Sequence, residues 1–171
     1  MNSIAQQQLI NGDFAKGDLT GWTVTDPAFY RVMPYADDKN CLVQLSAPRE
    51  QSIAQSVAIG PGTYQLGVWH RATDEQGQPV DKTTVSGGAL HYDTPDGGKI
   101  IPLVLFSSGE WSKWTVDFVI RRNDSTIANL FFQNIDNSVR KALQAAFQAS
   151  LGLRLEETPV SLRDIEIWQV R

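Results

Sequence analysis

The stretch "LINGDFAKGDLTGWTV", Leu9 to Val24, places a Phe and a Trp inside a run of turn-forming residues. The Asn-Gly-Asp triplet at 11–13 predicts a turn, because its short polar side chains can hydrogen-bond their own backbone. The Gly-Asp pair at 17–18 predicts a second turn. Phe14 and Trp22 each follow a turn, so we predict that they are core residues that close one end of a β-structure.

Short runs of alternating apolar and polar residues follow, separated by Gly, Pro, Asn and Asp. In "SKWTVDFVIR" and "GTYQLGVWHRA" every second residue is apolar, which is typical of half-buried antiparallel strands. "TPDGG" predicts a hairpin, since Gly tolerates positive φ. Further strands are predicted in "NCLVQLS", "QSIAQSVAI", "TTVSGGALHYD", "KIIPLVLF", "TIANLFFQN" and "SLRDIEIWQV".

Eight or nine strands at this spacing predict an all-β fold, a two-sheet antiparallel jelly-roll sandwich, in a single domain that spans 1–171. "FYRVMPYADDKN" is predicted as a loop at one edge. One segment, about 137–151, breaks the pattern: Val139, Leu143 and Phe147 recur at helical spacing. We therefore expect a short α-helix inserted before the last strand.

The chain has 171 residues, a net charge of −4 and 42% hydrophobic residues, which indicates a folded domain. It has no basic cluster, so nucleic-acid binding is not expected. No apolar run approaches the roughly 20 residues of a membrane-spanning helix, and Cys41 is the only cysteine. "MNSIAQQQLINGD" lacks the features of a leader peptide, so we expect a protein that is cytoplasmic, virion-associated or exported by a leaderless route.

Four landmarks in this order resemble bacterial carbohydrate-binding modules with the galactose-binding-like jelly-roll fold. They are "NGDF…GWTV", "SIAQSVAIGPGTYQLGVWHRA", "GEWSKWTVDFVI" and "LRDIEIWQV", which together cover nearly the whole chain except the helical segment. Openings similar to "LINGDF" also occur in phage tail-fibre proteins, where the same fold serves as a structural or receptor-binding unit. Fold similarity alone does not choose between these roles.

The resemblance also implies a structural calcium ion near the opening turn. The matching candidates for its ligands are Asp13 and Asp164. Calcium takes six to eight oxygen ligands, and Ala15 stands where these modules often have Glu. One carboxylate of the family's usual set is therefore missing from this chain.

A sugar-binding face needs flat apolar rings beside planar hydrogen-bonding groups. Strand alternation directs six such side chains away from the core, and we predict that they form one ligand-binding face. Trp69 beside Arg71 is the strongest pair among them, because Gly67 leaves space next to the indole. The six residues are Trp69, Arg71, His91, Asn129, Phe131 and Gln133.

Two functions remain open from the sequence. The first is a non-catalytic module that binds a glycan through this face. The second is a structural or receptor-binding component of a phage tail or surface assembly, which uses the same face for protein contacts, with the helix mediating a homo-oligomer or an assembly contact. The helix either leaves the face open or covers it with its apolar stripe. The chain carries no Gly-x-Ser-x-Gly or His-Glu-x-x-His motif, and we do not expect an enzyme.

Overall fold

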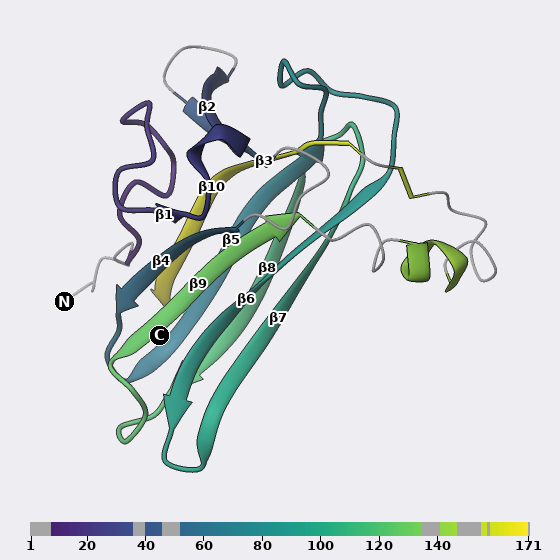
Figure 1. Ribbon diagram of the computed structural model, residues 1–171. Helices are drawn as coiled ribbons and strands as arrows, with labels where there is room; N and C mark the ends of the chain where they lie inside the picture. The colour runs from purple at the N-terminus through teal and green to yellow at the C-terminus, as the bar shows by residue number, and fades with distance from the viewer. Residues whose placement is uncertain are drawn as a thin grey trace.

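The computed structural model describes residues 8–35, 40–45, 52–134, 141–146, 155–156 and 158–170. Two five-stranded antiparallel sheets pack face to face, with strand orders β1-β4-β9-β6-β7 and β2-β3-β10-β5-β8 (Figure 1). The predicted two-sheet, all-β sandwich is therefore confirmed. The elements are β1 (Thr23–Val24), a 3₁₀ turn (Pro27–Phe29), β2 (Tyr30–Tyr35), β3 (Asn40–Leu45), β4 (Ser52–Ala58), β5 (Gly62–Ala72), β6 (Thr84–Thr94), β7 (Gly97–Ser107), β8 (Ser112–Ile120), β9 (Ile127–Asn134) and β10 (Val160–Val170).

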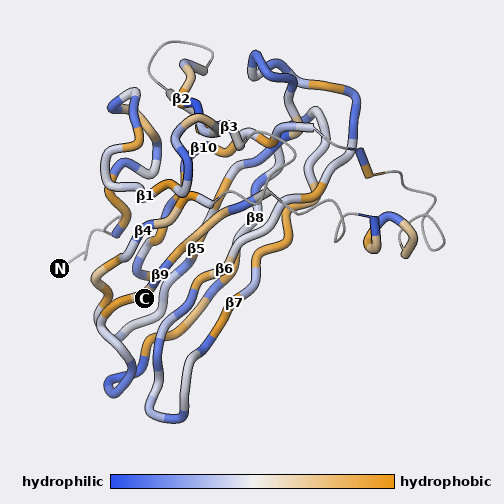
Figure 2. The backbone as a smooth tube through the Cα atoms, viewed as in Figure 1, coloured by the Kyte–Doolittle hydropathy of each residue, from blue (hydrophilic) through white to orange (hydrophobic). Residues whose placement is uncertain are grey.

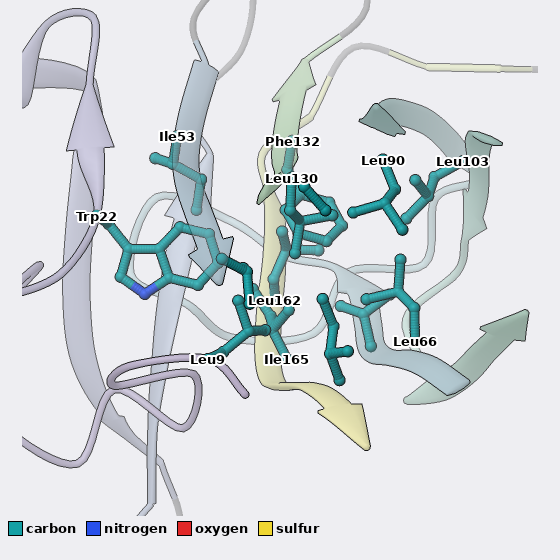
Figure 3. Close-up of a cluster of buried hydrophobic side chains, with 14 of the residues drawn as sticks. Leu9, Trp22, Ile53, Leu66, Leu90, Leu103, Leu130, Phe132, Leu162 and Ile165 are labelled. Atoms are coloured by element: carbon teal, nitrogen blue, oxygen red, sulfur yellow. The ribbon is translucent and has the colours of Figure 1, made fainter. Parts of the chain in front are cut away.

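The hydrophobic core fills the space between the two sheets. Figure 3 shows Leu90, Leu103 and Leu130 from one sheet facing Leu66 and Leu162 from the other. All five side chains are at most 1% exposed. Apolar burial of this kind is the main favourable term in folding, so the alternation along each strand determines which face of each sheet turns inward.

The strongest sequence patterns predicted their strands correctly. On β5 the inward side chains are Tyr64, Leu66 and Val68, all buried, and the rings of Tyr64 and Phe118 stack with centroids 5.5 Å apart. The predicted "TPDGG" hairpin joins β6 to β7, with Gly97 at a φ of 123°.

The stretch "FYRVMPYADDKN" was predicted as a loop, and this was wrong for its first half. Tyr30 to Tyr35 form β2, which pairs with β3 along its whole length. Pro34 obscured the strand because Pro cannot donate a ladder hydrogen bond, but β2 is the edge of its sheet, where Pro is tolerated. Tyr30 is only 5% exposed and anchors the strand to the core.

The opening stretch closes one end of the sandwich, as predicted. Phe14 and Trp22 are buried, and their rings stack with centroids 5.7 Å apart. The Asn11 side-chain amide donates to the carbonyl oxygens of Asp18 and Thr20, at 2.9 and 3.1 Å. The Trp22 indole N–H donates to the Asn11 carbonyl oxygen at 3.1 Å. One asparagine therefore holds both turns and the indole in place.

Gly12 joins this opening loop to the last strand. Its carbonyl oxygen accepts a hydrogen bond from the Ile165 backbone N–H at 2.9 Å. A Cβ on Gly12 would lie 2.0 Å from the Ile165 carbonyl oxygen, so no other residue fits. The contact falls at a bulge in β10 between Arg163 and Glu166, where Asp164 has a φ of 47°.

The described part of the predicted helix is 141–146, which confirms a short helix before the last strand. Figure 1 shows it to the right of the sandwich, clear of both sheets in this view. The Gln144 side-chain oxygen accepts a hydrogen bond from the Leu155 backbone N–H. Val139 and Phe147, also expected in the helix, lie outside the described residues. No helix in the described part of the chain is both long enough and apolar enough to cross a membrane.

We expect Gly12→Ala to lower the free energy of unfolding by about 3 kcal/mol, the upper range for overpacking. The added methyl group would displace the Ile165 carbonyl and separate the opening loop from β10. Thermal unfolding followed by circular dichroism measures the effect, as a drop in Tm on the order of 10 °C. Gly60→Ala is the matched control, because a Cβ there meets nothing within 4 Å. Equal melting temperatures for the two variants would contradict this role for Gly12.

The stability of the protein should fall in mild acid because of His70. This side chain is 4% exposed, its Nδ1 lies 2.8 Å from Ser107 Oγ, and burial lowers its pKa from 6.5 to about 4. The unfolded chain therefore binds a proton below pH 6.5 that the folded chain rejects until about pH 4. His70 then costs about 3 kcal/mol of stability as the pH falls through this window.

Urea unfolding at a series of pH values measures this loss. His70→Gln keeps a polar partner for Ser107 but cannot titrate, so its stability should change less between pH 6.5 and 4. His91→Gln, which removes the other histidine, is the control. An unchanged pH profile in His70→Gln would show that another group causes the acid sensitivity.

Candidate functional site

The six residues predicted to form one ligand-binding face are divided between the two sheets. Trp69 and Arg71 lie on β5, in the sheet β2-β3-β10-β5-β8. The other four lie on β6 and β9, in the opposite sheet: His91, Asn129, Phe131 and Gln133. The two outer faces point away from each other because the sheets pack through their inner faces. No single face carries all six residues, which corrects the expectation of one shared surface.

Trp69 belongs to a row of alternating cations and indoles on the outside of its sheet. The Arg71 guanidinium lies 4.5 Å from the centre of the Trp111 ring, and Arg163 lies 4.7 Å from the same ring. Arg163 also lies 5.0 Å from the centre of the Trp69 ring, and the Lys113 ammonium lies 5.9 Å from it. We call these five residues the cation–π stack, and each contact of this type contributes about 0.5–1 kcal/mol at exposed sites.

The cation–π stack uses the ring faces that a sugar would need. Arg163 and Lys113 are the residues directly across from Trp69 on β10 and β8, so they approach the indole from strands on either side. The Arg71 guanidinium is further held by the Gly77 carbonyl oxygen, 3.0 Å from Nη2. The space that Gly67 was expected to leave is occupied, since a Cβ there would lie 3.3 Å from Lys113 Cε. Trp69 therefore packs against cations from both neighbouring strands.

Two further polar pairs lie on the same outer face. The Trp168 indole N–H donates to Glu166 Oε2 at 2.9 Å. Next to it, the Gln65 side-chain amide donates to Asp117 Oδ1 at 3.0 Å. The first pair lies within β10, and the second crosses from β5 to β8.

The opposite sheet presents a different surface on β4, β9, β6 and β7. Phe131 stands at its centre, half-buried, and the residues directly across from it on the two neighbouring strands are Ala54 and Ala89. Because these side chains are short, the phenyl ring is the side chain in its row that can project furthest from the sheet. The surface, which we call the Phe131 face, comprises three rows: Ser52, Gln133, Gly87 and Val104; Ala54, Phe131, Ala89 and Pro102; Ser56, Asn129, His91 and Ile100.

Planar polar groups flank the phenyl ring on both sides along the strands. Gln133 and Asn129 each lie two residues from Phe131 on β9 and are exposed. The Asn129 side-chain oxygen accepts a hydrogen bond from Ser56 Oγ at 2.6 Å, which orients its amide. His91 is half-buried, and its Nε2 lies 3.6 Å from Asp93 Oδ1. The structure therefore brings together four of the six predicted residues: Phe131 and the three polar residues His91, Asn129 and Gln133 in the rows on either side of it.

The Phe131 face continues into an apolar strip on β7 that was not anticipated as part of the site. Ile100 is 64% exposed and Val104 is 46% exposed, and both side chains lie on the outer face. Figure 2 shows much of β7 in the hydrophobic colours. The signal in the sequence was the run "KIIPLVLF", which is apolar at consecutive positions although only alternate residues reach the core.

The predicted calcium ligands are engaged with protein groups. Asp13 is exposed, and its Oδ1 accepts a hydrogen bond from the Ala15 backbone N–H at 3.1 Å. Asp164 Oδ2 accepts one from Arg163 Nη1 at 2.8 Å, with which it forms an ion pair. Within the described residues no group of three or more His, Cys, Asp or Glu side chains is placed to hold a metal ion. These two carboxylates alone supply fewer oxygens than the six to eight that calcium takes.

Comparison with known proteins bears on the fold. No protein-family model matches the sequence, and no curated protein sequence matches it. Several solved structures, in contrast, are similar to this chain in fold. A family 16 carbohydrate-binding module has a TM-score of 0.63 and 17% identity, covering 94% of this chain and 98% of that one. The chain has the fold of a carbohydrate-binding module.

Two other structures extend the comparison. TmCBM61, solved in complex with β-1,4-galactotriose, has a TM-score of 0.61 and 14% identity, covering 96% of this chain and 99% of that one. The enzymatically active domain of tailspike protein 4 from bacteriophage CBA120 has a TM-score of 0.63 and 12% identity. The match covers 96% of this chain but only 21% of the tailspike domain. These two carbohydrate-binding modules thus match over nearly their full length, whereas the tailspike match concerns one part of a larger chain.

We expect calcium to have no effect on thermal stability. An ion present at a hundred times its Kd would add about 2.7 kcal/mol to the free energy of unfolding. Asp13 and Asp164, each already bonded to a protein group, supply only part of the six to eight oxygens that calcium needs. Melting curves of the protein in excess calcium and in excess EDTA should therefore coincide, with magnesium as the control for ionic strength. A higher Tm in calcium that is lost in Asp164→Asn would overturn this expectation.

Proposed function

We propose that this protein is a non-catalytic carbohydrate-binding module whose ligand lies on the Phe131 face. The observation that carries the proposal is the arrangement of Phe131 between Ala54 and Ala89, with Asn129 and Gln133 on either side along β9. The ring can stack on the C–H face of a pyranose because nothing taller stands in its row. Each flanking amide can donate a hydrogen bond from its NH2 group and accept one at its oxygen. Two neighbouring hydroxyl groups of a sugar can make both of these bonds.

The dimensions of the sheet suit a chain of several sugars. Strands lie about 4.8 Å apart, so the four strands of the Phe131 face extend over roughly 14 Å. A glycan that crosses them from β4 to β7 would meet the small residues of β4, then Phe131, then the exposed apolar side chains Ile100 and Val104. We therefore infer an extended oligosaccharide as the ligand, with several sugar units in contact.

The composition of the face argues against hydrolysis of that ligand. Glycosidases place two carboxyl groups about 5–10 Å apart across the scissile bond. Asp93, adjoining the rows of the Phe131 face on β6, is the only carboxylate that the described parts of β4, β9, β6 and β7 direct to this side. Binding without bond cleavage is the function that these side chains support. The similarity of the fold to carbohydrate-binding modules supports the same proposal.

The proposal predicts that Phe131→Ala weakens glycan binding by about tenfold or more, because it removes the stacking surface. A tenfold loss corresponds to about 1.4 kcal/mol of binding free energy. A glycan array identifies the ligand, and isothermal titration calorimetry then compares the wild type with the variants. Phe131→Tyr keeps the ring and should retain most of the affinity, which separates loss of stacking from loss of folding.

Trp69→Ala is the matched control on the opposite sheet. It removes a larger aromatic side chain and two cation–π contacts, so it should lower the Tm while glycan affinity stays unchanged. If Trp69→Ala abolished binding and Phe131→Ala did not, the ligand would lie on the face that carries the cation–π stack, and the proposed site would be wrong.

One observation favours a second function, the protein-contact role in a phage tail or surface assembly. The exposed apolar strip of β7, with Ile100 and Val104, is also what a protein interface requires, and a tailspike domain shares the fold. The expected helix-mediated oligomer has no such support from 141–146, the described part of the helix. Absence of any glycan hit, together with self-association in light scattering that Ile100→Ser abolishes, would favour the assembly role.

A further inference from the structure

A pocket of about 460 Å³ opens at the end of the sandwich where the β6–β7 hairpin meets the β8–β9 loop. Figure 1 shows both connections at the same end of the molecule, at the bottom of the view. The pocket shares no residue with the Phe131 face. Its lining consists of Tyr92, Thr94, Pro95, Asp96, Lys99, Val119, Arg121, Arg122, Asn123 and Asp124.

Hydrogen bonds within and between the two connections give the pocket a defined shape. The Asp124 backbone N–H donates to the Arg121 carbonyl oxygen at 3.0 Å, and the Arg121 backbone N–H donates to Asp124 Oδ2 at 2.6 Å. The Ser125 backbone N–H donates to the Asp93 carbonyl oxygen at 2.7 Å, which fastens this loop to the end of β6. These hydrogen bonds therefore fix the backbone around the pocket without a ligand.

One of the lining residues is a buried tyrosine with a lysine over its ring. Tyr92 is 1% exposed, and its hydroxyl donates to the Val119 carbonyl oxygen at 3.1 Å. The Lys99 ammonium lies 5.8 Å from the centre of the Tyr92 ring, on the pocket side of β7. A cation–π contact of this kind limits the positions that the lysine adopts.

Three basic residues line this pocket in a protein whose net charge is −4. Lys99, Arg121 and Arg122 all line it, and within the described residues none of the three forms an ion pair with a carboxylate. Two carboxylates are present as well: Asp96 at the hairpin, and Asp124, whose Oδ2 accepts the Arg121 backbone N–H. The guanidinium groups can form bidentate hydrogen bonds with a carboxylate or sulfate group.

We propose that this pocket binds an acidic saccharide, a sugar that carries a carboxylate or a sulfate group, with Lys99, Arg121 and Arg122 around the anionic group. A volume of about 460 Å³ exceeds what a bare anion fills and lies within the range for small-ligand sites. Asp96, Asn123 and Asp124 supply acceptors and donors for the hydroxyl groups of the same sugar. The site is additional to the Phe131 face and is tested independently of it.

The test is an NMR titration of the intact chain at low ionic strength with sodium glucuronate, sodium sulfate and, as the neutral probe, glucose. Glucuronate should perturb the backbone amides of Thr94–Lys99 and Arg121–Asp124, and the shifts should weaken as sodium chloride is added. Glucose should leave these amides unchanged. Tighter binding of glucuronate than of sulfate assigns the pocket to an acidic saccharide, whereas binding of sulfate that is as tight as that of glucuronate, or tighter, would overturn that assignment.

Variants separate the pocket from the overall charge and from the proposed glycan face. Lys99→Gln and Arg122→Gln should each weaken glucuronate binding about tenfold, the loss expected when one charge-assisted hydrogen bond is removed. Lys16→Gln removes the same charge from the exposed opening turn and should have no effect. Phe131→Ala should also have no effect on glucuronate. Equal losses in Lys16→Gln and Lys99→Gln, or no shift at the two connections, would refute the pocket.

Discussion

The contact between Gly12 and the last strand is the constraint on which the rest of the structure depends. The Gly12 carbonyl oxygen accepts the Ile165 N–H, and the absence of a side chain lets the two backbones meet. This contact holds the opening loop, with Phe14 and Trp22, against the strand at the centre of the opposite sheet. It joins the first and last described parts of the chain, which are far apart in sequence, and so closes one end of the core.

The same contact lies at the bulge that determines what the outer face of that sheet can do. Leu162 and Ile165 both face the core, although they are three residues apart, because the extra residue of the bulge lies between them. Arg163 therefore stands on the outer face directly across from Trp69, where its guanidinium contacts both Trp69 and Trp111. The bulge in β10 thus places a guanidinium against both indoles of this outer face. This is why our proposal places the ligand on the Phe131 face of the other sheet.

The sequence predicted the strands well and the site only in part, for a physical reason. Alternation along β5 correctly identified Tyr64, Leu66 and Val68 as inward residues, since burial follows a period of two within one strand. It also identified Trp69 and Phe131 as outward residues. It could not reveal that they lie on different sheets, because strand order depends on pairing between distant segments. Nor could it reveal that Arg163, 94 residues after Trp69, covers the indole.

The distribution of charge gives a reason why the two candidate sites call for different ligands. The described rows of the Phe131 face contain amides, hydroxyls, one histidine and apolar groups, and no Lys or Arg. A ligand that lies there desolvates few charges, which suits uncharged sugar units. The end pocket instead concentrates Lys99, Arg121 and Arg122, which suits an anionic group. Because the hairpin of β6 and β7 connects the two regions, a glycan with neutral units and a terminal acid is the type of molecule that would use both.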